Sequence, residues 1–424
     1  MSKDMNWTTG LWNENAWEEN LPNLLWAADW APVRALEEPL LAHPGGLYHP
    51  VLKEEMARAT ERIVNVETTL LDDPKQGRPV LKEGPCFGSP ARAVEDLQKA
   101  GFGIALLANN HLGDFGPEGI VSTRTILREA GLRTVGAGES QADAYRALTF
   151  PLGSHTVALV NFHEGEEGTF TARNPALAGW DLERVRAEVV AQHRAGRVVL
   201  VAAHAGREFV PVQPRYVQEA YRSLIEAGAR AVIGHHPHVP CGIESWQGCP
   251  IVYSQGNFVF WSGQPGLMRR LGYLVRLALT PEGTVALKLI PYRITQKGLR
   301  PLEEREKRWL FGQLAEVSGE ALAPSSVQAY WEAAMDVIPR EEWLRDATGM
   351  GHTAKLMAAA NPQGLARLRT RLSGPAHVHF MVEGITRVLE GRHGQSDAVR
   401  QEKVRLWNEV PEEAAETLMG TSSD

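Results

Sequence analysis

Three features are scarce in this chain of 424 residues: cysteine, excess positive charge and long apolar runs. The cysteines are Cys86, Cys241 and Cys249, with no C-x-x-C spacing, so neither a disulfide framework nor a structural zinc site is expected. Lys and Arg number 44 against 51 Asp and Glu, and the net charge of −7 indicates no general affinity for nucleic acid. No run of about eighteen apolar residues occurs, so no transmembrane helix is expected.

The N-terminal stretch also lacks the apolar segment of a secretory signal. It is polar and acidic, and we interpret residues 1–21 as an N-terminal extension. Three tryptophans, Trp7, Trp12 and Trp17, are expected to pack this extension onto the main domain. Because neither a signal nor a membrane anchor is visible, the sequence predicts a cytoplasmic protein.

The first 300 residues alternate apolar, strand-like runs with amphipathic helical patterns. One helix is expected to begin with Ser89 as its cap and Pro90 in its first turn, and another opens at Gln213-Pro214 and ends at Gly228. Repeated strand–helix–strand units predict a layered α/β domain with mainly parallel pairing. The strand candidates are residues 24–33, 62–68, 103–111, 157–164, 198–206 and 231–238.

Polar residues gather at the ends of these predicted strands, where functional groups collect in parallel sheets. Capping and turn residues would explain any one such placement, but five consecutive ones favour a site. Imidazole is a common ligand of transition metals, so the last cluster indicates a metal centre. The residues in chain order are Asp29; Asn65 and Glu67; Asn109, Asn110 and His111; His204, Gly206 and Glu208; and His235, His236 and His238.

Several strings resemble the CapA family, whose members are associated with poly-γ-glutamate capsule synthesis. They are NVETTL, LLANNHLGDFGPEGI, HAGREFVP and IEAGARAVIGHHPHVPCGIESWQGCPIVYSQGNFVF, and the resemblance covers roughly residues 22–300. ANNH and GHHPH followed by YSQGNF are specific in combination. The resemblance implies a calcineurin-like metallophosphoesterase fold, a four-layer α/β/β/α sandwich with a metal centre at the sheet edges.

The resemblance also implies roles for individual residues. His111 matches a histidine that steadies the transition state or protonates the leaving group. Arg34 matches the arginine that closes the family's first motif, the one that contains Asp29. Glu208 is a candidate general base. His235 is expected to orient a ligand or to replace one. The implied metal ligands are Asp29, Glu67, Asn110, His204, His236 and His238. Residues expected to contact substrate or support the ligands are Asn65, Asn109, His163 and Asn257.

Carboxylate, amide and imidazole donors together suit Mn, Fe or Zn better than Ca or Mg. Such a metal lowers the pKa of water and polarises the bond under attack, and His111 has a suitable pKa for a general acid. Ala28 replaces a glycine of the family's first motif, and Ala31 occupies a position where the wider superfamily has a histidine. Glu67 also replaces a shorter aspartate, so one metal position is poorly supplied. One or two divalent metal ions are therefore both possible.

Beyond residue 300 the sequence reads as amphipathic helices, and we define residues 301–424 as a helical C-terminal region. This region is expected to cover the mouth of the site, to mediate dimerisation or to complete the core. Its histidines His352, His377 and His379 are more typical of core or surface positions than of metal ligands.

The sequence thus predicts a soluble metal-dependent hydrolase of an anionic small molecule or polymer, with a homo-oligomer left open. Family association favours a γ-glutamyl or related amide bond, whereas the fold favours a phosphoester. Positive charge for the substrate would come from the metal and from Arg34, Arg207 or Arg215. A non-catalytic protein that binds or assembles an anionic polymer is the alternative, disfavoured by the retained acid beside the metal ligands.

Overall fold

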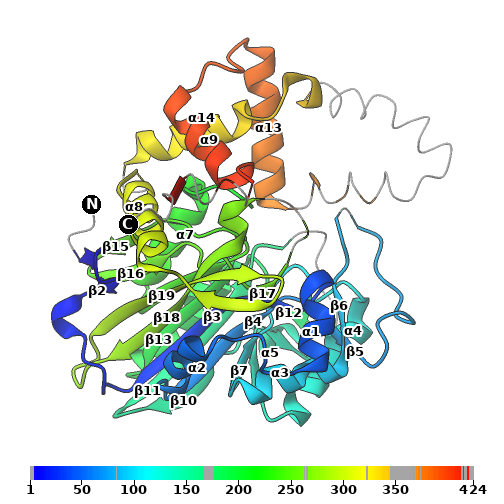
Figure 1. Cartoon of the computed structure of the whole chain (residues 1–424), viewed down its shortest axis with the longest axis vertical. Helices are drawn as coiled ribbons and strands as arrows, with labels where there is room; N and C mark the ends of the chain where they lie inside the picture. Colours follow the sequence, from blue (N-terminus) through cyan, green and yellow to red (C-terminus); the bar gives the residue numbers. More distant parts are fainter. Residues whose placement is uncertain are drawn as a thin grey trace.

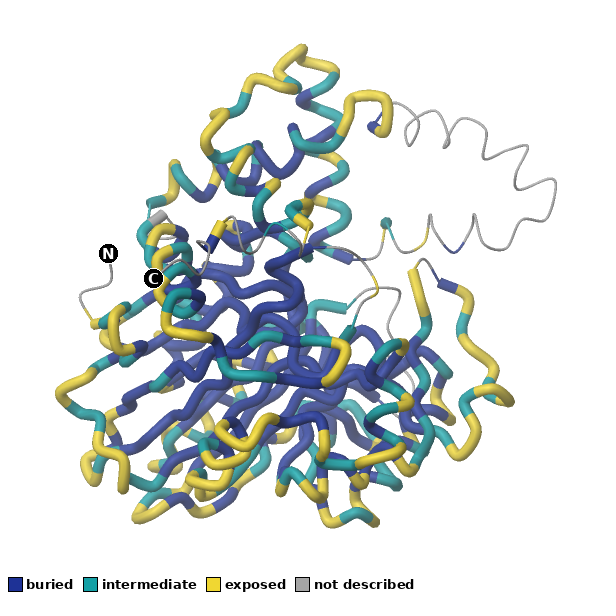
Figure 2. The backbone as a smooth tube through the Cα atoms, in the orientation of Figure 1, coloured by how far each residue is buried: buried dark blue, intermediate teal, exposed yellow. Residues whose placement is uncertain are grey.

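Two β-sheets packed face to face form the centre of the computed structural model, and helices cover both outer faces (Figure 1). Buried residues follow the strands of both sheets, and the exposed ones lie mainly on loops and outer helix faces (Figure 2). The structure describes residues 4–82, 84–165, 176–261, 263, 266–320, 323–343, 366, 369, 371–372, 374–411, 414 and 418–419.

The first sheet is built around β3 (Asn23–Ala31), which is buried along its whole length. Its strands run in the order β1-β2-β19-β18-β3-β4-β7-β8, with β17 beside β3 and β20 beside β19. The strands from β3 to β8 are parallel, but β18 and β19 are antiparallel, so the parallel pairing expected from the sequence holds for only part of this sheet. The remaining bounds are β1 (Met5–Asn6), β2 (Leu11–Trp12), β4 (Glu61–Val66), β7 (Ile104–Leu106), β8 (Arg133–Val135), β17 (Asn257–Phe260), β18 (Leu271–Leu279), β19 (Val285–Thr295) and β20 (Gly298–Pro301).

The second sheet has the order β10-β11-β13-β14-β16-β15, and its four central strands are parallel. Its register places His163, His204 and His235 side by side at the ends of β11, β13 and β14. The bounds are β10 (Leu148–Leu152), β11 (His155–His163), β13 (Val198–His204), β14 (Ala229–His235), β15 (Ile243–Trp246) and β16 (Cys249–Val252). Two short pairs complete the strands: β5 (Thr69–Leu71) with β6 (Gly88–Pro90), and β9 (Ala137–Gly138) with β12 (Ala176–Leu177).

Alternation along β3 separates two cores. Trp26 packs between the sheets, whereas Leu25 and Ala27 pack under the outer helices. The helices over the first sheet are α1 (Glu37–Ala42), α2 (Pro50–Ala57), α3 (Val94–Lys99) and α4 (Gly116–Glu129). Those over the second sheet are α5 (Gln141–Tyr145), α6 (Leu182–Arg194) and α7 (Arg215–Glu226). The predicted four-layer α/β/β/α sandwich is therefore confirmed.

Of the two helix starts predicted from capping residues, one is confirmed and the other is wrong. Pro214 is the N-cap of α7, and Gly228 follows its end with a φ of 114°, as the sequence predicts. Ser89, expected to cap a helix, instead lies in β6 with its Oγ 3.1 Å from Thr68 Oγ1, and α3 starts only at Val94 after a 3-10 turn. That prediction was wrong because pairing with β5 holds Ser89 extended.

Where the structure describes it, the chain after residue 301 is mainly helical, and these helices lie at one end of the sandwich (Figure 1). They are α8 (Glu304–Glu320), α9 (Pro324–Asp336), α13 (Pro375–Leu389) and α14 (Ala398–Asn408). Residues 344–365 of the predicted helical region, with His352 among them, lie outside the described residues. Among the described helices none is long and apolar enough to cross a membrane.

The N-terminal extension packs onto the main domain through its three tryptophans, as predicted. Trp12 is buried and pairs with Leu287 of β19. Trp7 packs edge-on against Phe311, and Trp17 lies 5.2 Å from the guanidinium carbon of Arg276. The extension therefore adds strands to the first sheet.

Candidate metal centre

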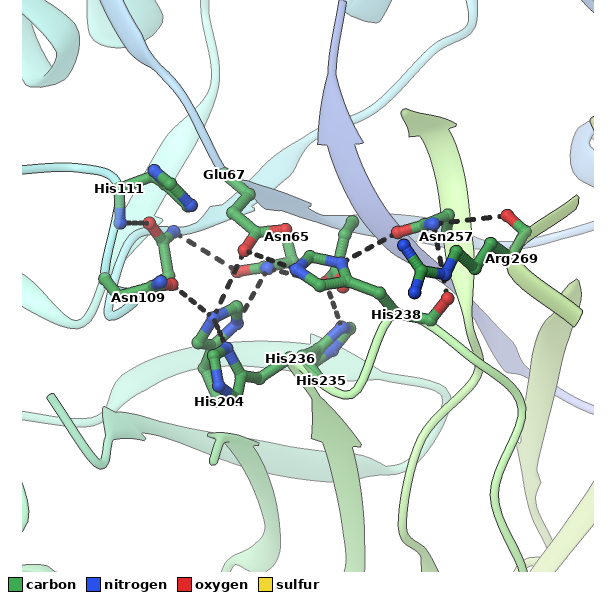
Figure 3. Close-up of polar contacts among 12 residues, drawn as sticks. Asn65, Glu67, Asn109, His111, His204, His235, His236, His238, Asn257 and Arg269 are labelled. Carbon is green, nitrogen blue, oxygen red and sulfur yellow. Dashed lines mark hydrogen bonds and ion pairs between the residues drawn. The ribbon is translucent and has the colours of Figure 1, made fainter. Parts of the chain in front are cut away.

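The carboxyl ends of β3, β4, β13 and β14 meet between the two sheets, and a buried cluster of carboxylates and imidazoles lies there (Figure 3). The cluster residues are Asp29, Glu67, His204, His236 and His238, and each is less than 10% exposed. Such a density of ionisable groups in a dry core is costly unless the groups are paired or hold a cation. A bound cation would offset this cost, and the spacing of the side chains decides whether one fits.

Glu67, His204 and His236 form the first donor group. His204 Nε2 lies 3.4 Å from Glu67 Oε1 and 3.2 Å from His236 Nδ1. Two ligand atoms on one tetrahedral metal with bonds of about 2.0–2.1 Å are separated by about 3.3 Å. Asn110 Oδ1, 2.8 Å from the same nitrogen, adds an amide oxygen. The spacing of these side chains is therefore compatible with ligation of one metal ion.

Asp29, Glu67 and His238 form the second group, which shares Glu67 with the first. His238 Nε2 is 3.7 Å from Glu67 Oε1. Asn257 fixes the tautomer of His238, since its Nδ2 donates to the carbonyls of His238 and Arg269 and its Oδ1 must therefore accept from His238 Nδ1–H at 2.9 Å. The Nε2 lone pair of His238 is thereby left facing Glu67, as a metal ligand requires.

Glu208 belongs to a third possible donor group, with His236 and His238. All three candidate ligand atoms lie within 4.8 Å of one another, and Glu208 is partly exposed. This position suits a group that meets both the metal and incoming substrate. The predicted role of Glu208 as a base therefore stays a prediction with a compatible location.

The backbone that carries the last histidines is strained. His236 and His238 have φ values of 96° and 57°, in a region that non-glycine residues seldom occupy. At Gly234 the chain passes so close to β16 that a Cβ would lie 2.2 Å from the carbonyl oxygen of Tyr253. Strain of this kind costs roughly 1–3 kcal/mol per residue and gathers at functional sites.

His235 orients Asp29 and is not placed as a ligand. The indole N–H of Trp26 donates to His235 Nε2 at 3.1 Å, so His235 carries its proton on Nδ1 and donates it to Asp29 Oδ1 at 3.1 Å. Asn65 Nδ2 donates to the same oxygen at 2.8 Å. Both ring nitrogens of His235 are thus occupied, and Asp29 Oδ2 is left for the metal.

Replacing Trp26 by phenylalanine is expected to weaken metal binding by roughly ten- to a hundredfold, because an outer hydrogen bond that sets a tautomer controls ligand orientation. Phenylalanine cannot donate to His235, whose ring is then free to change tautomer and release Asp29. The metal dissociation constant, measured by competition with a chromogenic chelator, gives the result directly.

Trp30→Phe is the matched control. Trp30 lies on the same strand, is equally buried, and donates its indole N–H to Asp96 Oδ2 at the same 3.1 Å, but on the opposite face of the sheet. Both variants lose similar volume and one hydrogen bond. Equal metal affinity in the two variants would contradict the role assigned to Trp26.

His111 has a separate support. Its Nδ1 lies 2.7 Å from Asp114 Oδ2 and 3.3 Å from Lys82 Nζ, its ring packs on Phe87 at 4.2 Å, and Lys82 also forms an ion pair with Asp114. Proton donation to Asp114 directs the Nε2 of His111 away from this pair. The sequence analysis missed Lys82, a buried lysine in the long loop between β5 and β6, because no pattern around it distinguishes it from surface lysines.

The loop before His111 is held by Asn109. Its Nδ2 donates to the carbonyl of Val66 at 2.8 Å, and its Oδ1 accepts from the backbone N–H groups of His111 and Leu112. Asn109 therefore shapes the loop rather than facing a ligand. The strand predicted over 103–111 ends at Leu106 because this side chain pairs with loop amides.

Burial and hydrogen bonding set the charge of the cluster. Burial alone would raise the pKa of Asp29, but hydrogen bonds from His235 and Asn65 together with histidine charge hold the pKa below its ordinary value. Burial and the neighbouring imidazoles lower the pKa of His204 well below its usual range. Asp29 is thus favoured as an anion and His204 as a neutral base, the forms that ligate metals.

Two predicted site residues, Arg34 and His163, belong to none of the three donor groups. Arg34 is exposed, its guanidinium lies near Gly263, and within the described residues no hydrogen bond or ion pair joins it to the cluster. His163 is buried beside His204 in the second sheet. Ala31, which replaces the expected histidine, packs with Val33, Phe87 and Phe260 in a small apolar cluster.

Three further side chains considered in the sequence, Arg207, Arg215 and His379, each contact a neighbouring side chain in the structure. Arg207 stacks on Phe380 with its guanidinium carbon 4.3 Å from the ring centre, whereas Arg215 forms an exposed ion pair with Glu219. His379 is exposed and stacks on Tyr216. None of these three side chains is among the residues that line the pocket described below.

The sandwich and its two donor groups define a layered α/β protein with a candidate divalent metal centre at the edges of its sheets. Residues 35–262 match the family described as "Bacterial capsule synthesis protein PGA_cap". The match spans more than half of the chain, and the protein therefore belongs to this family, the CapA family expected from the sequence. Asp29 and Arg34 precede the matched range, and the helical C-terminal region follows it.

Named relatives agree with this assignment. The chain is 28% identical over 276 residues to the "Probable polyglutamine synthesis accessory protein" of Mycobacterium tuberculosis, covering 60% of this chain and 72% of that one. It is 27% identical over 281 residues to the "Capsule biosynthesis protein CapA" of Bacillus anthracis, covering 64% and 62%. A solved structure of a hypothetical protein from Thermus thermophilus is 15% identical, with a TM-score of 0.40 over 64% of this chain and 99% of that one.

Proposed function

We propose that this protein is a metal-dependent hydrolase of an anionic substrate, with a γ-glutamyl or related amide bond as the first candidate. The observation that carries the proposal is the pair of donor groups that share Glu67, beside a histidine held by Asp114. Pure binding would need the metal donors but not an oriented His–Asp pair. The relatives named for capsule synthesis, together with the association of the family with poly-γ-glutamate, support an anionic polymer as the substrate class.

Each residue has a definable task in this proposal. Glu67, His204 and His236 would hold one ion, with Asn110 beside them, and Asp29, Glu67 and His238 would hold a second. Bound Mn, Fe or Zn would supply Lewis acidity, which lowers the pKa of water and polarises the bond under attack. His111, with Nδ1 directed to Asp114, presents Nε2 to donate a proton to the leaving group.

A phosphoester is the second candidate bond. Its support is that both donor groups contain Glu67, because two cations held so close together would suit in-line displacement at phosphorus. The two candidates require the same ligands and the same acid, and they differ only in the group that enters the pocket. Substrate screening therefore distinguishes them.

The test begins with elemental mass spectrometry of protein purified without chelator, beside His236→Ala. We expect about one or two Mn, Fe or Zn ions per chain, and fewer in the variant because the first donor group is broken. The metal-loaded protein is then assayed on γ-glutamyl-p-nitroanilide and p-nitrophenyl phosphate. Absence of metal after reconstitution would overturn the hydrolase proposal and favour a binding or assembly protein.

A further inference from the structure

A pocket adjoins the metal cluster, and helix α13 forms part of its wall. The lining includes Asn110, His204 and His236 from the candidate centre, together with Ala376 and His377 near the start of α13. The helix lies beyond residue 262, where the family match ends. The C-terminal region therefore contributes to the space in front of the metal donors.

Glu164 fastens the start of α13 to the sandwich. Its Oε1 accepts from the Tyr216 hydroxyl at 2.6 Å and from the backbone N–H of Ala376 at 2.8 Å, and its Oε2 accepts from Gly206 N–H at 2.9 Å. Ala376 supplies one of the first N–H groups of the helix, which have no partner within the helix. Because Gly206 follows closely on β13, the same carboxylate links α13 to the strand that ends in His204.

We propose that His377 determines substrate specificity by binding a carboxylate of the substrate that lies beside the scissile bond. The inference rests on the proposed function, since it requires a γ-glutamyl chain to lie across the opening of this pocket. In such a chain every residue keeps a free α-carboxylate close to the linking amide. A chain whose amide carbonyl faces the metal donors would therefore present a carboxylate to the pocket wall.

The composition of the wall agrees with this ligand. Glu164 is the single carboxylate among the described lining residues, and its two oxygens are engaged by the three donors named above. The other contributions are imidazole, amide and backbone groups, and the positive end of the α13 dipole lies at the same place. His377, as an imidazole donor, adds recognition that neither the ligands nor His111 provides.

The inference is tested by titration calorimetry on the full-length, Mn-loaded protein with two probes, tri-γ-glutamate and inorganic phosphate. His377→Gln is expected to weaken tri-γ-glutamate binding about tenfold and to leave phosphate binding and metal content unchanged, because phosphate needs only the metal side. His377→Arg is expected to restore peptide binding. Val382→Ala, on the exposed face of the same helix, should behave as wild type.

Equal affinity of wild type and His377→Gln for tri-γ-glutamate would overturn the inference, as would wild-type protein that binds phosphate but not the peptide. Thermal unfolding of each variant shows whether a loss reflects misfolding, and restored binding in His377→Arg provides a second check. A different result would contradict the proposed function itself. In that case peptide binding responds to His377→Gln, but wild-type protein cleaves no γ-glutamyl bond.

Discussion

Glu67→Gln is expected to abolish metal binding at both donor groups and to lower hydrolysis at least a thousandfold. Glu67 is the one residue that the two groups share, and it is fully buried between His204 and His238. Glutamine keeps the volume and removes the negative charge that would offset bound cations. Metal content by mass spectrometry and turnover of the best substrate are the measurements.

A thermal measurement adds a readout independent of turnover. Metal at a hundred times its dissociation constant stabilises the native state by about 2.7 kcal/mol, which raises the Tm of wild type. The Glu67→Gln protein is expected to show no such rise. In contrast, His236→Ala keeps the second donor group and should retain part of it.

Glu244→Gln is the matched control for this experiment. Glu244 is also fully buried, but it pairs with Arg222 and accepts from the Tyr253 hydroxyl at 2.6 Å in the second sheet, with no part in the metal donor groups. Its replacement should lower stability with and without metal and leave the metal-induced rise intact. Full metal occupancy in Glu67→Gln would show that Glu67 is not a bridging ligand.

His111→Gln is expected to retain its metal and to lose turnover by a factor of about 10²–10⁴, the range typical of a missing general acid. Its side chain contacts Asp114, Lys82 and Phe87, and it is absent from the three donor groups. Metal content, metal affinity and kcat together separate its role from that of a ligand.

Two further variants sharpen this prediction. Asp114→Asn should reduce kcat with metal retained, because the amide no longer holds the proton on Nδ1 of His111. His155→Gln is the control and should leave kcat and metal content unchanged. The His155 ring contacts the carbonyl of Thr280 at the end of β11 opposite His163. Metal loss in His111→Gln equal to that in His236→Ala would reject the division between ligand and acid.

Much of the candidate centre was predictable because its residues stand at strand ends. Glu67 follows the alternation of β4, in which Ile63 and Asn65 also face the second sheet. The strand that ends at His204 and the strand that leads into the GHHPH segment likewise follow local patterns of apolar residues. Parallel pairing brings such ends to one edge, so sequence order and spacing were enough to group these side chains.

Asp29 shows the limit of this reasoning. Simple alternation after Trp26 and Ala27 would turn Asp29 toward the outer helices, away from the metal. A register shift between Ala27 and Asp29 corrects this by one residue, so that Asp29 faces His235. Bulges re-aim side chains in this way, and their position depends on the partner strand rather than on the strand's own sequence.

The sequence by itself determined the alternating strands and helices, the family, and the candidate metal donors at the strand ends, because these follow from local periodicity and motif spacing. Tertiary structure decided the contacts between distant segments: the tautomer of His235 through Trp26, the burial of Lys82 against His111, and the fastening of α13 by Glu164. These contacts join residues from 29 to 212 positions apart. No local pattern encodes them, since they arise only when the two sheets and the C-terminal helices pack together.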